Sequence, residues 1–286
     1  TVHAEIAWPH VEHLELPGSD GRPIEGWLLT PAAGGPPHPT VLYVHGGPNI
    51  AWGHAFTIDA QLLAGAGYAV LLVNYRGSTG YGREFATSLM GAGAWGTADY
   101  EDLMSAVDHT VAAGTVDPDR LGVCGLSNGG TLTCWIVGHT DRFKAAVAEN
   151  PITDFAGLYG VIDLGAQAVV EIMGGHLHEI PEVYRSASPL TYARNCTTPT
   201  LLVQGEADVR CPAGQSEQFY TALTVAGCPT EMLRLPGVGH WGAIAGPVPI
   251  RRAQNDALVD WMDRHVRERR PVRSHARSAD GPTSPA

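Results

Sequence analysis

The chain has 286 residues, of which 44% are hydrophobic and 16% are charged, and its 35 glycines follow no period. This composition excludes an intrinsically disordered protein and a collagen-like fibre, because the apolar residues suffice for a sizeable core. With 18 basic and 29 acidic residues the formal net charge is −11. Such a balance argues against nucleic acid and anionic membrane surfaces as partners.

The first elements in chain order are a hairpin and a buried strand. Residues 11–16 alternate apolar and polar side chains, 19–22 carry a turn signal, and 24–30 read as the partner strand. A Pro/Gly linker over 31–39 leads into the apolar run 40–44. A short run of this kind is typical of a strand that is buried on both faces.

From that strand onwards, helices and strands alternate. The pattern predicts helices over 58–66, 100–113, 129–140, 213–225 and 253–266, and strands over 69–74, 121–124, 145–149, 200–204 and 230–235. This alternation predicts an α/β fold with a mostly parallel sheet, helices on both of its faces, and ligands at the carboxyl ends of the strands.

Two segments depart from the alternation. Residues 154–190 contain aromatic and aliphatic residues but no clear strand, so we expect a helical insertion over the active site. Residues 268–286 are rich in Arg, Ser and Pro and have almost no large apolar residue, which predicts a disordered tail. The expected catalytic domain is therefore 1–267.

The hydropathy and the cysteines of the sequence indicate the cellular compartment. No apolar run approaches the roughly 20 residues of a membrane span, and the N-terminus lacks a signal-peptide pattern. Both observations predict a cytoplasmic protein without a membrane partner. A reduced compartment also fits the five scattered cysteines, which form no CxxC pair: Cys124, Cys134, Cys196, Cys211 and Cys228.

A nucleophile motif lies between a predicted strand and a predicted helix. Gly125-x-Ser127-x-Gly129 follows the run 121–124 and precedes the helix 129–140. A tight strand-to-helix turn of this kind pushes the Ser hydroxyl outward, and the glycines avoid collisions in the turn. The pattern predicts Ser127 as a catalytic nucleophile.

The partners of Ser127 follow in the order acid, then His, which is the order of α/β-hydrolases. Asp208 follows the strand 200–204, and His240 follows the strand 230–235. We expect His240 to take the Ser127 proton while Asp208 orients the imidazole. Glu206, two residues nearer the strand, is an alternative acid.

Two backbone donors are expected to form an oxyanion hole. His45-Gly46-Gly47 follows the strand 40–44, and this places the N–H of Gly47 with that of Asn128 near the developing negative charge. We expect His45 to hold this loop through hydrogen bonds rather than to take part in the reaction.

A metal or cofactor is not expected. His176-x-His178 with Glu179 offers too few ligands without a further one nearby, so a solvated or packed pair is predicted. A triad with an oxyanion hole supplies nucleophile, base and charge stabilisation by itself.

Several motifs are spread along the chain. They are His45-Gly46-Gly47-Pro48, Asn-Tyr-Arg-Gly-Ser-Thr-Gly-Tyr-Gly at 74–82, Trp95-Gly96 with Asp99 and Asp102, 125–130, and Gln-x-x-Gln-Phe-Tyr at 215–220. Together they resemble the prolyl oligopeptidase family, above all the catalytic domain of acylaminoacyl peptidases and dipeptidyl peptidases, and the matches run from about residue 11 to 266. The resemblance implies an α/β-hydrolase serine peptidase with Ser127, Asp208 and His240 as its triad.

The resemblance also implies substrate contacts. Arg210 stands where the family holds a substrate carbonyl; the alternative is a surface Arg paired with Glu206 or Glu217. Trp241 replaces a residue that is often small in the family, and it would narrow the leaving-group side or act as a partial lid. An apolar pocket on the acyl side would be lined by Pro151, Ile152, Phe155 and Tyr159. The alternative is that these side chains are simply part of the packed core.

Family members usually carry an N-terminal β-propeller over the active site. Thr1 falls close to where a propeller would end, so we expect that a propeller was either removed or never present.

The sequence therefore predicts a serine hydrolase that cleaves peptide or (acyl)aminoacyl amide bonds through an acyl-enzyme. An esterase or acyltransferase on the same triad is the alternative, and a non-catalytic binding protein of this fold is a more distant one. A homo-oligomer whose partner subunit restricts access stays open.

Overall fold

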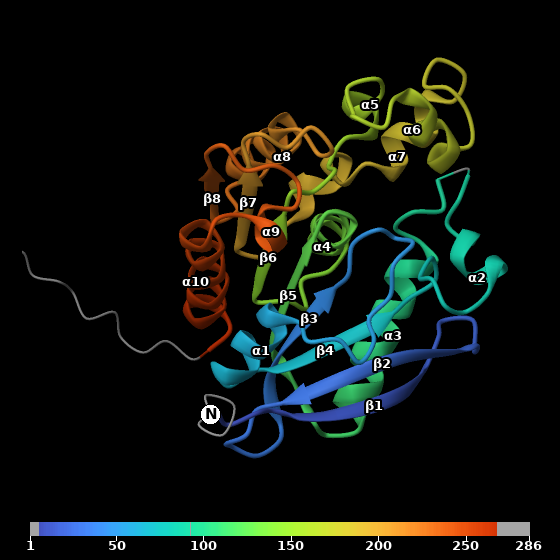
Figure 1. Cartoon of the computed structure of the whole chain (residues 1–286). Helices are drawn as coiled ribbons and strands as arrows, with labels where there is room; N and C mark the ends of the chain where they lie inside the picture. The colour runs from blue at the N-terminus through green and yellow to red at the C-terminus, as the bar shows by residue number, and fades with distance from the viewer. Residues whose placement is uncertain (1–5, 92, 268–286) are drawn as a thin grey trace, which may run out of the picture.

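The predicted strands pair into one eight-stranded sheet in a computed structural model, which describes residues 6–91 and 93–267 (Figure 1). β1 pairs antiparallel with β2, β2 pairs antiparallel with β4, and the other neighbours are parallel. The predicted α/β fold with an N-terminal hairpin is confirmed. The order across the sheet is β1 (His10–Pro17), β2 (Pro23–Thr30), β4 (Ala69–Asn74), β3 (His38–Val44), β5 (Val116–Leu126), β6 (Ala145–Glu149), β7 (Thr200–Gly205) and β8 (Thr230–Leu235).

Helices cover both faces of this sheet. Helices α1 (Ile58–Gly65) and α10 (Val248–His265) pack on one face, through side chains such as Leu63 and Trp261. Because both faces are covered, every residue of β4, β6 and β7 is buried. The opposite face carries α3 (Ala98–Ala112), α4 (Asn128–His139) and α8 (Ala213–Val225).

The segment between β6 and β7 is helical. Figure 1 shows α5, α6 and α7 grouped together, apart from α1 and α10. Their apolar side chains form a cluster of their own, which also takes in Trp95 and Cys211. The predicted tail at 268–286 lies outside the described residues. The segment comprises α5 (Phe155–Leu158), α6 (Ala166–Met173), α7 (Pro181–Ala187) and the 3₁₀ helix η2 (Pro189–Asn195).

Three features of the fold differ from the sequence prediction. β5 begins at Val116 rather than at residue 121, because polar residues interrupt its apolar pattern and the pairing with β3 shifts register there. α10 begins five residues early, at Val248, because a proline is tolerated in the first turn of a helix. Helices α2 (Arg83–Thr87) and α9 (Gly242–Ala245) were not predicted, since they are too short to show a period.

A buried ion pair anchors the loop after β4. The Arg76 Nε and Nη2 atoms donate to the two oxygens of Asp102 at 2.9 and 2.8 Å. The Asp102 carboxylate is buried and also accepts from the backbone N–H of Ser19 at 2.9 Å. This contact joins the loop to α3 and to the hairpin turn, so the Arg76 side chain anchors the loop.

Candidate active site

Ser127 lies in a strained turn between β5 and α4. Its backbone has φ 61° and ψ −121°, a conformation that non-glycine residues adopt rarely. A Cβ on Gly129 would come within 2.1 Å of the Val44 carbonyl oxygen, so this position admits only glycine. The Ser127 N–H donates to the Glu149 carbonyl at 2.9 Å, which ties the turn to β6.

The structure brings the three expected side chains together. The His240 Nε2 and Ser127 Oγ atoms are 2.9 Å apart, and His240 Nδ1 lies 2.7 Å from Asp208 Oδ2. The other Asp208 oxygen accepts from the backbone N–H groups of Arg210 and Cys211 at 2.8 and 2.9 Å. Buried and held on both oxygens, the Asp208 carboxylate can fix the tautomer that leaves Nε2 free to accept a proton.

Glu206, the alternative acid, is directed elsewhere. Its Oε1 accepts from Arg234 Nε at 2.8 Å. Arg234 also pairs with Glu217. The geometry thus places Asp208, and not Glu206, against the imidazole.

The loop after β3 presents backbone donors beside Ser127. The Gly47 N–H donates to no backbone acceptor among residues 6–91 and 93–267, and Asn128 opens α4, where an N–H has no acceptor within the helix. Gly47 has φ 105°, which favours glycine. The two donors are therefore free to bind an oxyanion.

His45 holds this loop, as the sequence analysis expects. Its Nδ1 and Nε2 atoms lie 2.8 Å from the Gly46 carbonyl oxygen and 2.8 Å from Ser78 Oγ. Its ring stacks on Tyr75 with centroids 4.3 Å apart. Burial lowers the pKa of His45 to about 4, so the ring is neutral near pH 7.

Arg210 has a partner that the sequence did not suggest. Its Nη2 donates to Asp163 Oδ2 at 3.1 Å, which links the loop of Asp208 to the segment between β6 and β7. The expected alternative, a pair with Glu206 or Glu217, is wrong, because those two carboxylates bind Arg234. Asp163 is exposed, so this ion pair lies at the surface.

The residues expected to line an acyl-side pocket lie in a packed cluster. Ile152 is buried, and Phe155 is fully buried with its ring edge-to-face against Trp95 at 5.6 Å. The Tyr159 hydroxyl lies 2.9 Å from His176 Nδ1. A contact of these side chains with substrate stays a prediction.

His176 and His178 belong to no group of three potential ligands among the described residues. Their rings stack at 5.6 Å, and Glu179 accepts from the His176 backbone N–H at 3.0 Å. Within residues 6–91 and 93–267, one such group is present, Asp208, Cys211 and His240, with ligand atoms within 4.8 Å of one another. Two of its members already hydrogen-bond each other as part of the triad arrangement.

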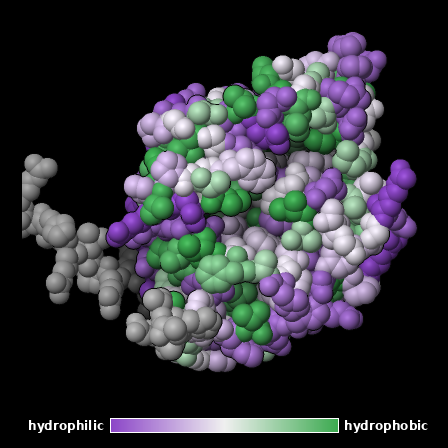
Figure 2. Space-filling model, in the orientation of Figure 1, coloured by the Kyte–Doolittle hydropathy of each residue, from purple (hydrophilic) through white to green (hydrophobic). Residues whose placement is uncertain are grey.

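A cavity of about 530 Å³ opens beside Ser127. It extends from the Gly46-Gly47 loop and His240 to the start of α1 and to α10. Hydrophobic side chains gather around a hollow in the middle of the face seen in Figure 2. Its wall includes residues that the sequence analysis singled out, namely Gly47, Ser127, Arg210, His240 and Trp241. The sequence carries no signal for other lining residues, among them Ile50, Trp52, Phe56, Asp59, Ile244 and Arg251.

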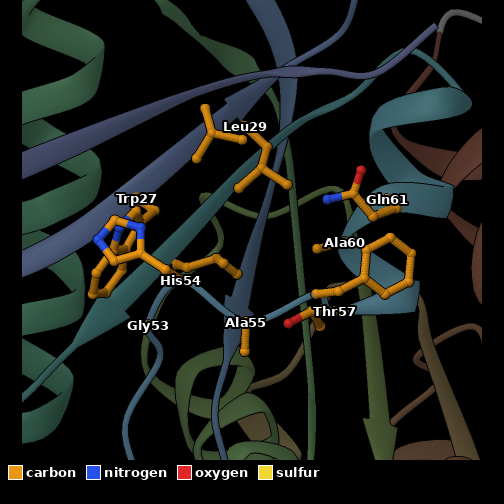
Figure 3. A pocket seen from close by; sticks show the side chains of 11 residues that line it. Trp27, Leu29, Gly53, His54, Ala55, Thr57, Ala60 and Gln61 are labelled. Carbon is orange, nitrogen blue, oxygen red and sulfur yellow. The ribbon is translucent and has the colours of Figure 1, made fainter. Parts of the chain in front are cut away.

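A second cavity of about 350 Å³ adjoins the first and shares Phe56 and Thr57 with it. Figure 3 shows His54 beside Trp27 at one end and Leu29, Ala60 and Gln61 at the other. Its described lining includes no carboxylate and no thiol. This cavity therefore holds an imidazole, that of His54, but among its described lining residues no carboxylate to orient it as Asp208 orients His240.

Two carboxyl groups near Ser127 have raised pKa values: Glu149, which is buried at the end of β6, and Asp59, which lines the cavity. Burial and the nearby Asp59 raise the pKa of Glu149 to about 8. The Gln254 side-chain amide donates to Glu149. Burial likewise raises the pKa of Asp59, whose Oδ2 accepts from the Tyr43 hydroxyl at 2.8 Å.

The free energy of unfolding should therefore depend on Glu149. Between its ordinary pKa of 4.5 and about 8, Glu149 is ionised in the unfolded chain but protonated in the folded one, so stability falls as the pH rises. Glu149→Gln should flatten this decline in melting temperatures measured from pH 5 to 8. The exposed Glu171→Gln is the control and should keep the wild-type slope. An unchanged slope in Glu149→Gln would contradict the assignment.

The fold and the arrangement of Ser127, His240 and Asp208 define the class of α/β-hydrolases with a serine nucleophile. The chain belongs to the prolyl oligopeptidase family, whose family model matches residues 54–269. The family resemblance seen in the sequence is confirmed.

Relatives in sequence include a peptidase and an acylamino-acid-releasing enzyme. The uncharacterized peptidase YuxL of Bacillus subtilis is 39% identical over 258 residues, which cover 89% of this chain and 39% of the relative. The human acylamino-acid-releasing enzyme is 33% identical over 243 residues, which cover 81% of this chain and 32% of the relative. The chain thus spans between 32% and 39% of the length of these relatives.

Solved structures agree with this relationship. The acylaminoacyl peptidase of Pyrococcus horikoshii superposes with a TM-score of 0.88 at 29% identity, over 93% of this chain and 43% of that one. A puromycin-hydrolyzing peptidase of Mycobacterium tuberculosis gives a TM-score of 0.84 at 30% identity, over 92% and 40%. None of the helices in the described part of this chain is long and apolar enough to cross a membrane.

Proposed function

We propose that this chain is a catalytic domain that hydrolyses acylaminoacyl peptide or aminoacyl amide bonds through an acyl-enzyme on Ser127. The observation that carries the proposal is the run of contacts from Ser127 Oγ to His240 Nε2 at 2.9 Å and from His240 Nδ1 to Asp208 at 2.7 Å. The names of the relatives support an acylaminoacyl substrate. One related acylaminoacyl peptidase is solved in complex with Z-Gly-Gly-Phe-chloromethyl ketone, which supports a peptide ligand.

Each proton transfer and bond change of the proposed reaction can be assigned to a residue of the site. Ser127 Oγ attacks the scissile carbonyl carbon and gives its proton to His240 Nε2, while the N–H groups of Gly47 and Asn128 bind the oxyanion. When the C–N bond breaks, His240 returns the proton to the leaving amine. Water, deprotonated by the same imidazole, then attacks the acyl carbon and frees Ser127.

The acyl side of the substrate belongs to the same proposal. Ile152, Phe155 and Tyr159 would bound that side and Arg210 would hold a carbonyl, with residues 154–190 covering them. The pair of Arg210 with Asp163 supports this arrangement, since it fixes the guanidinium beside the Asp208 loop. A cytoplasmic location is also proposed, and the five cysteines, all free and buried, support it.

An esterase or acyltransferase on the same three residues is the second candidate. The observation in its favour is the exposed rim of the cavity beside Ser127, where Trp241 is 57% exposed. An open rim would admit a small alcohol or amine as acyl acceptor.

The test compares kcat/KM on acetyl-blocked and free aminoacyl p-nitroanilides with that on a p-nitrophenyl acyl ester. Esters are intrinsically more reactive, so anilide cleavage is the informative arm. We expect anilide cleavage with a preference for the blocked substrate. Ester cleavage without any anilide cleavage would overturn the peptidase proposal and favour the second candidate.

A further inference from the structure

We propose that the 530 Å³ cavity beside Ser127 binds the leaving group and that Arg251 in its wall binds a carboxylate of that group. The substrates would then be short peptides with an apolar residue after the scissile bond and a carboxylate close behind it. This inference rests on the proposed peptidase function and names its substrate class.

The position of His240 places the leaving group in this cavity. The imidazole must return its proton to the leaving amine, so that amine departs on the side of His240. His240 and the next residue, Trp241, both line the cavity. Ile152 and Phe155, which are proposed for the acyl side, are absent from its described lining, whereas Arg210, which is proposed to hold an acyl-side carbonyl, is part of it. The part of the cavity that we assign to the leaving group is therefore the part lined by His240 and Trp241.

The walls of the cavity suit an apolar side chain. Phe56 and Ile244, which line it, are 66% and 60% exposed, although residues of this type are usually buried. With Ile50 and Trp241 they form an exposed apolar rim around the entrance, and such a concentration of apolar surface marks a binding site. An apolar residue of the leaving group would cover part of this surface.

Arg251 lines the same cavity without a hydrogen-bond partner for its side chain among the described residues. Its guanidinium forms no hydrogen bond and no ion pair with residues 6–91 and 93–267, and its Nε is buried without an acceptor. Arg210, which also lines the cavity, is by contrast paired with Asp163. An unsatisfied buried donor is unfavourable, and a guanidinium binds a carboxylate through two parallel hydrogen bonds. A carboxylate is therefore the ligand that fits Arg251.

The nearby Asp59 carboxylate is not bound by the Arg251 guanidinium. Its Oδ2 accepts from the Tyr43 hydroxyl, and it forms no ion pair with Arg251 within the described residues. Burial raises the pKa of Asp59, while the hydrogen bond from Tyr43 and the positive charge of Arg251 act in the opposite direction. Asp59 thus acts on Arg251 through its charge but leaves the guanidinium without a hydrogen bond, so the guanidinium stays available to the substrate.

The experiment measures kcat/KM on N-acetyl-Phe-Phe with a free C-terminal carboxylate and on its C-terminal amide. The wild-type chain should favour the free acid by about tenfold or more, the typical effect of a charge-assisted hydrogen bond. Arg251→Gln should bring the acid-to-amide ratio close to one, mainly through a higher KM for the acid. Arg251→Lys, which keeps the charge without the planar fork, should give an intermediate ratio.

Arg252→Gln is the matched control, because it removes the same charge one residue away. The Arg252 side chain is 81% exposed, and its Nε lies 3.5 Å from Asp256 Oδ2. The Arg252→Gln variant should therefore keep the wild-type acid-to-amide ratio. N-acetyl-Phe-Glu-amide distinguishes the source of the carboxylate. If cleavage of N-acetyl-Phe-Glu-amide depends on Arg251 and cleavage of the free acid does not, the carboxylate that Arg251 binds is an acidic side chain rather than the chain terminus.

Equal rates on acid and amide in the wild type, together with no Arg251 dependence of the Glu substrate, would overturn the inference. An equal loss of the preference for acid over amide in Arg251→Gln and Arg252→Gln would also overturn the inference, since a long-range effect of charge would then explain the preference. Cleavage of N-acetyl-Phe p-nitroanilide separates the two proposals, because this substrate has no carboxylate. If the anilide is cleaved without any carboxylate preference, only the Arg251 inference fails; if no amide is cleaved, both proposals fail.

Discussion

Ser127→Ala is expected to reduce kcat on an acyl-aminoacyl anilide by about 10⁶-fold, because it removes the atom that forms the acyl-enzyme. The fold should survive, since Ser127 Oγ lies at the cavity and alanine fits the same turn. Steady-state kinetics and the melting temperature measure the two effects. Labelling by a fluorophosphonate, which reports the nucleophile directly, should disappear in the same variant.

Ser186→Ala is the matched control for this variant, because it makes the same change at an exposed serine on α7. It should keep both turnover and labelling. Turnover at the wild-type level in Ser127→Ala, or labelling that persists there, would show that another residue is the nucleophile.

The sequence predicted the frame of the site because its signals are local. Glycines flank Ser127 in a strand-to-helix turn, and Asp208 and His240 each follow a strand of the parallel sheet. The carboxyl ends of parallel strands lie at one edge of a sheet, so strand order alone predicts that such residues meet. The structure brings them within hydrogen-bond distance.

The remainder of the site depends on contacts that leave no local pattern. Asp163 meets Arg210 across 47 positions of the sequence, in a segment without a clear period. Asp59 and Arg251 reach one cavity from α1 and α10, which are far apart in the chain. Their positions follow from how the two helices pack on the sheet. Trp241 was recognisable only because it stands next to the expected His240.

Asp208→Asn tests how the imidazole is oriented, and it should lower kcat by about 10³ to 10⁴-fold at neutral pH. Asp208 Oδ1 accepts from two backbone N–H groups, so the asparagine oxygen is expected to keep those contacts and to turn its NH₂ toward His240. His240 Nδ1 would then have to accept rather than donate. Its proton would move to Nε2, the atom that must take the proton of Ser127.

Glu206→Gln is the matched control, because Glu206 is the other acid that follows β7. Its carboxylate pairs with Arg234 near the surface, where an ion pair contributes little. The control should therefore keep turnover close to the wild-type rate. A large loss in Glu206→Gln with little loss in Asp208→Asn would reverse the assignment of the acid. Loss in Asp208→Asn alone, with an unchanged melting temperature, would mean that the carboxylate acts through the tautomer of His240 and not through the fold.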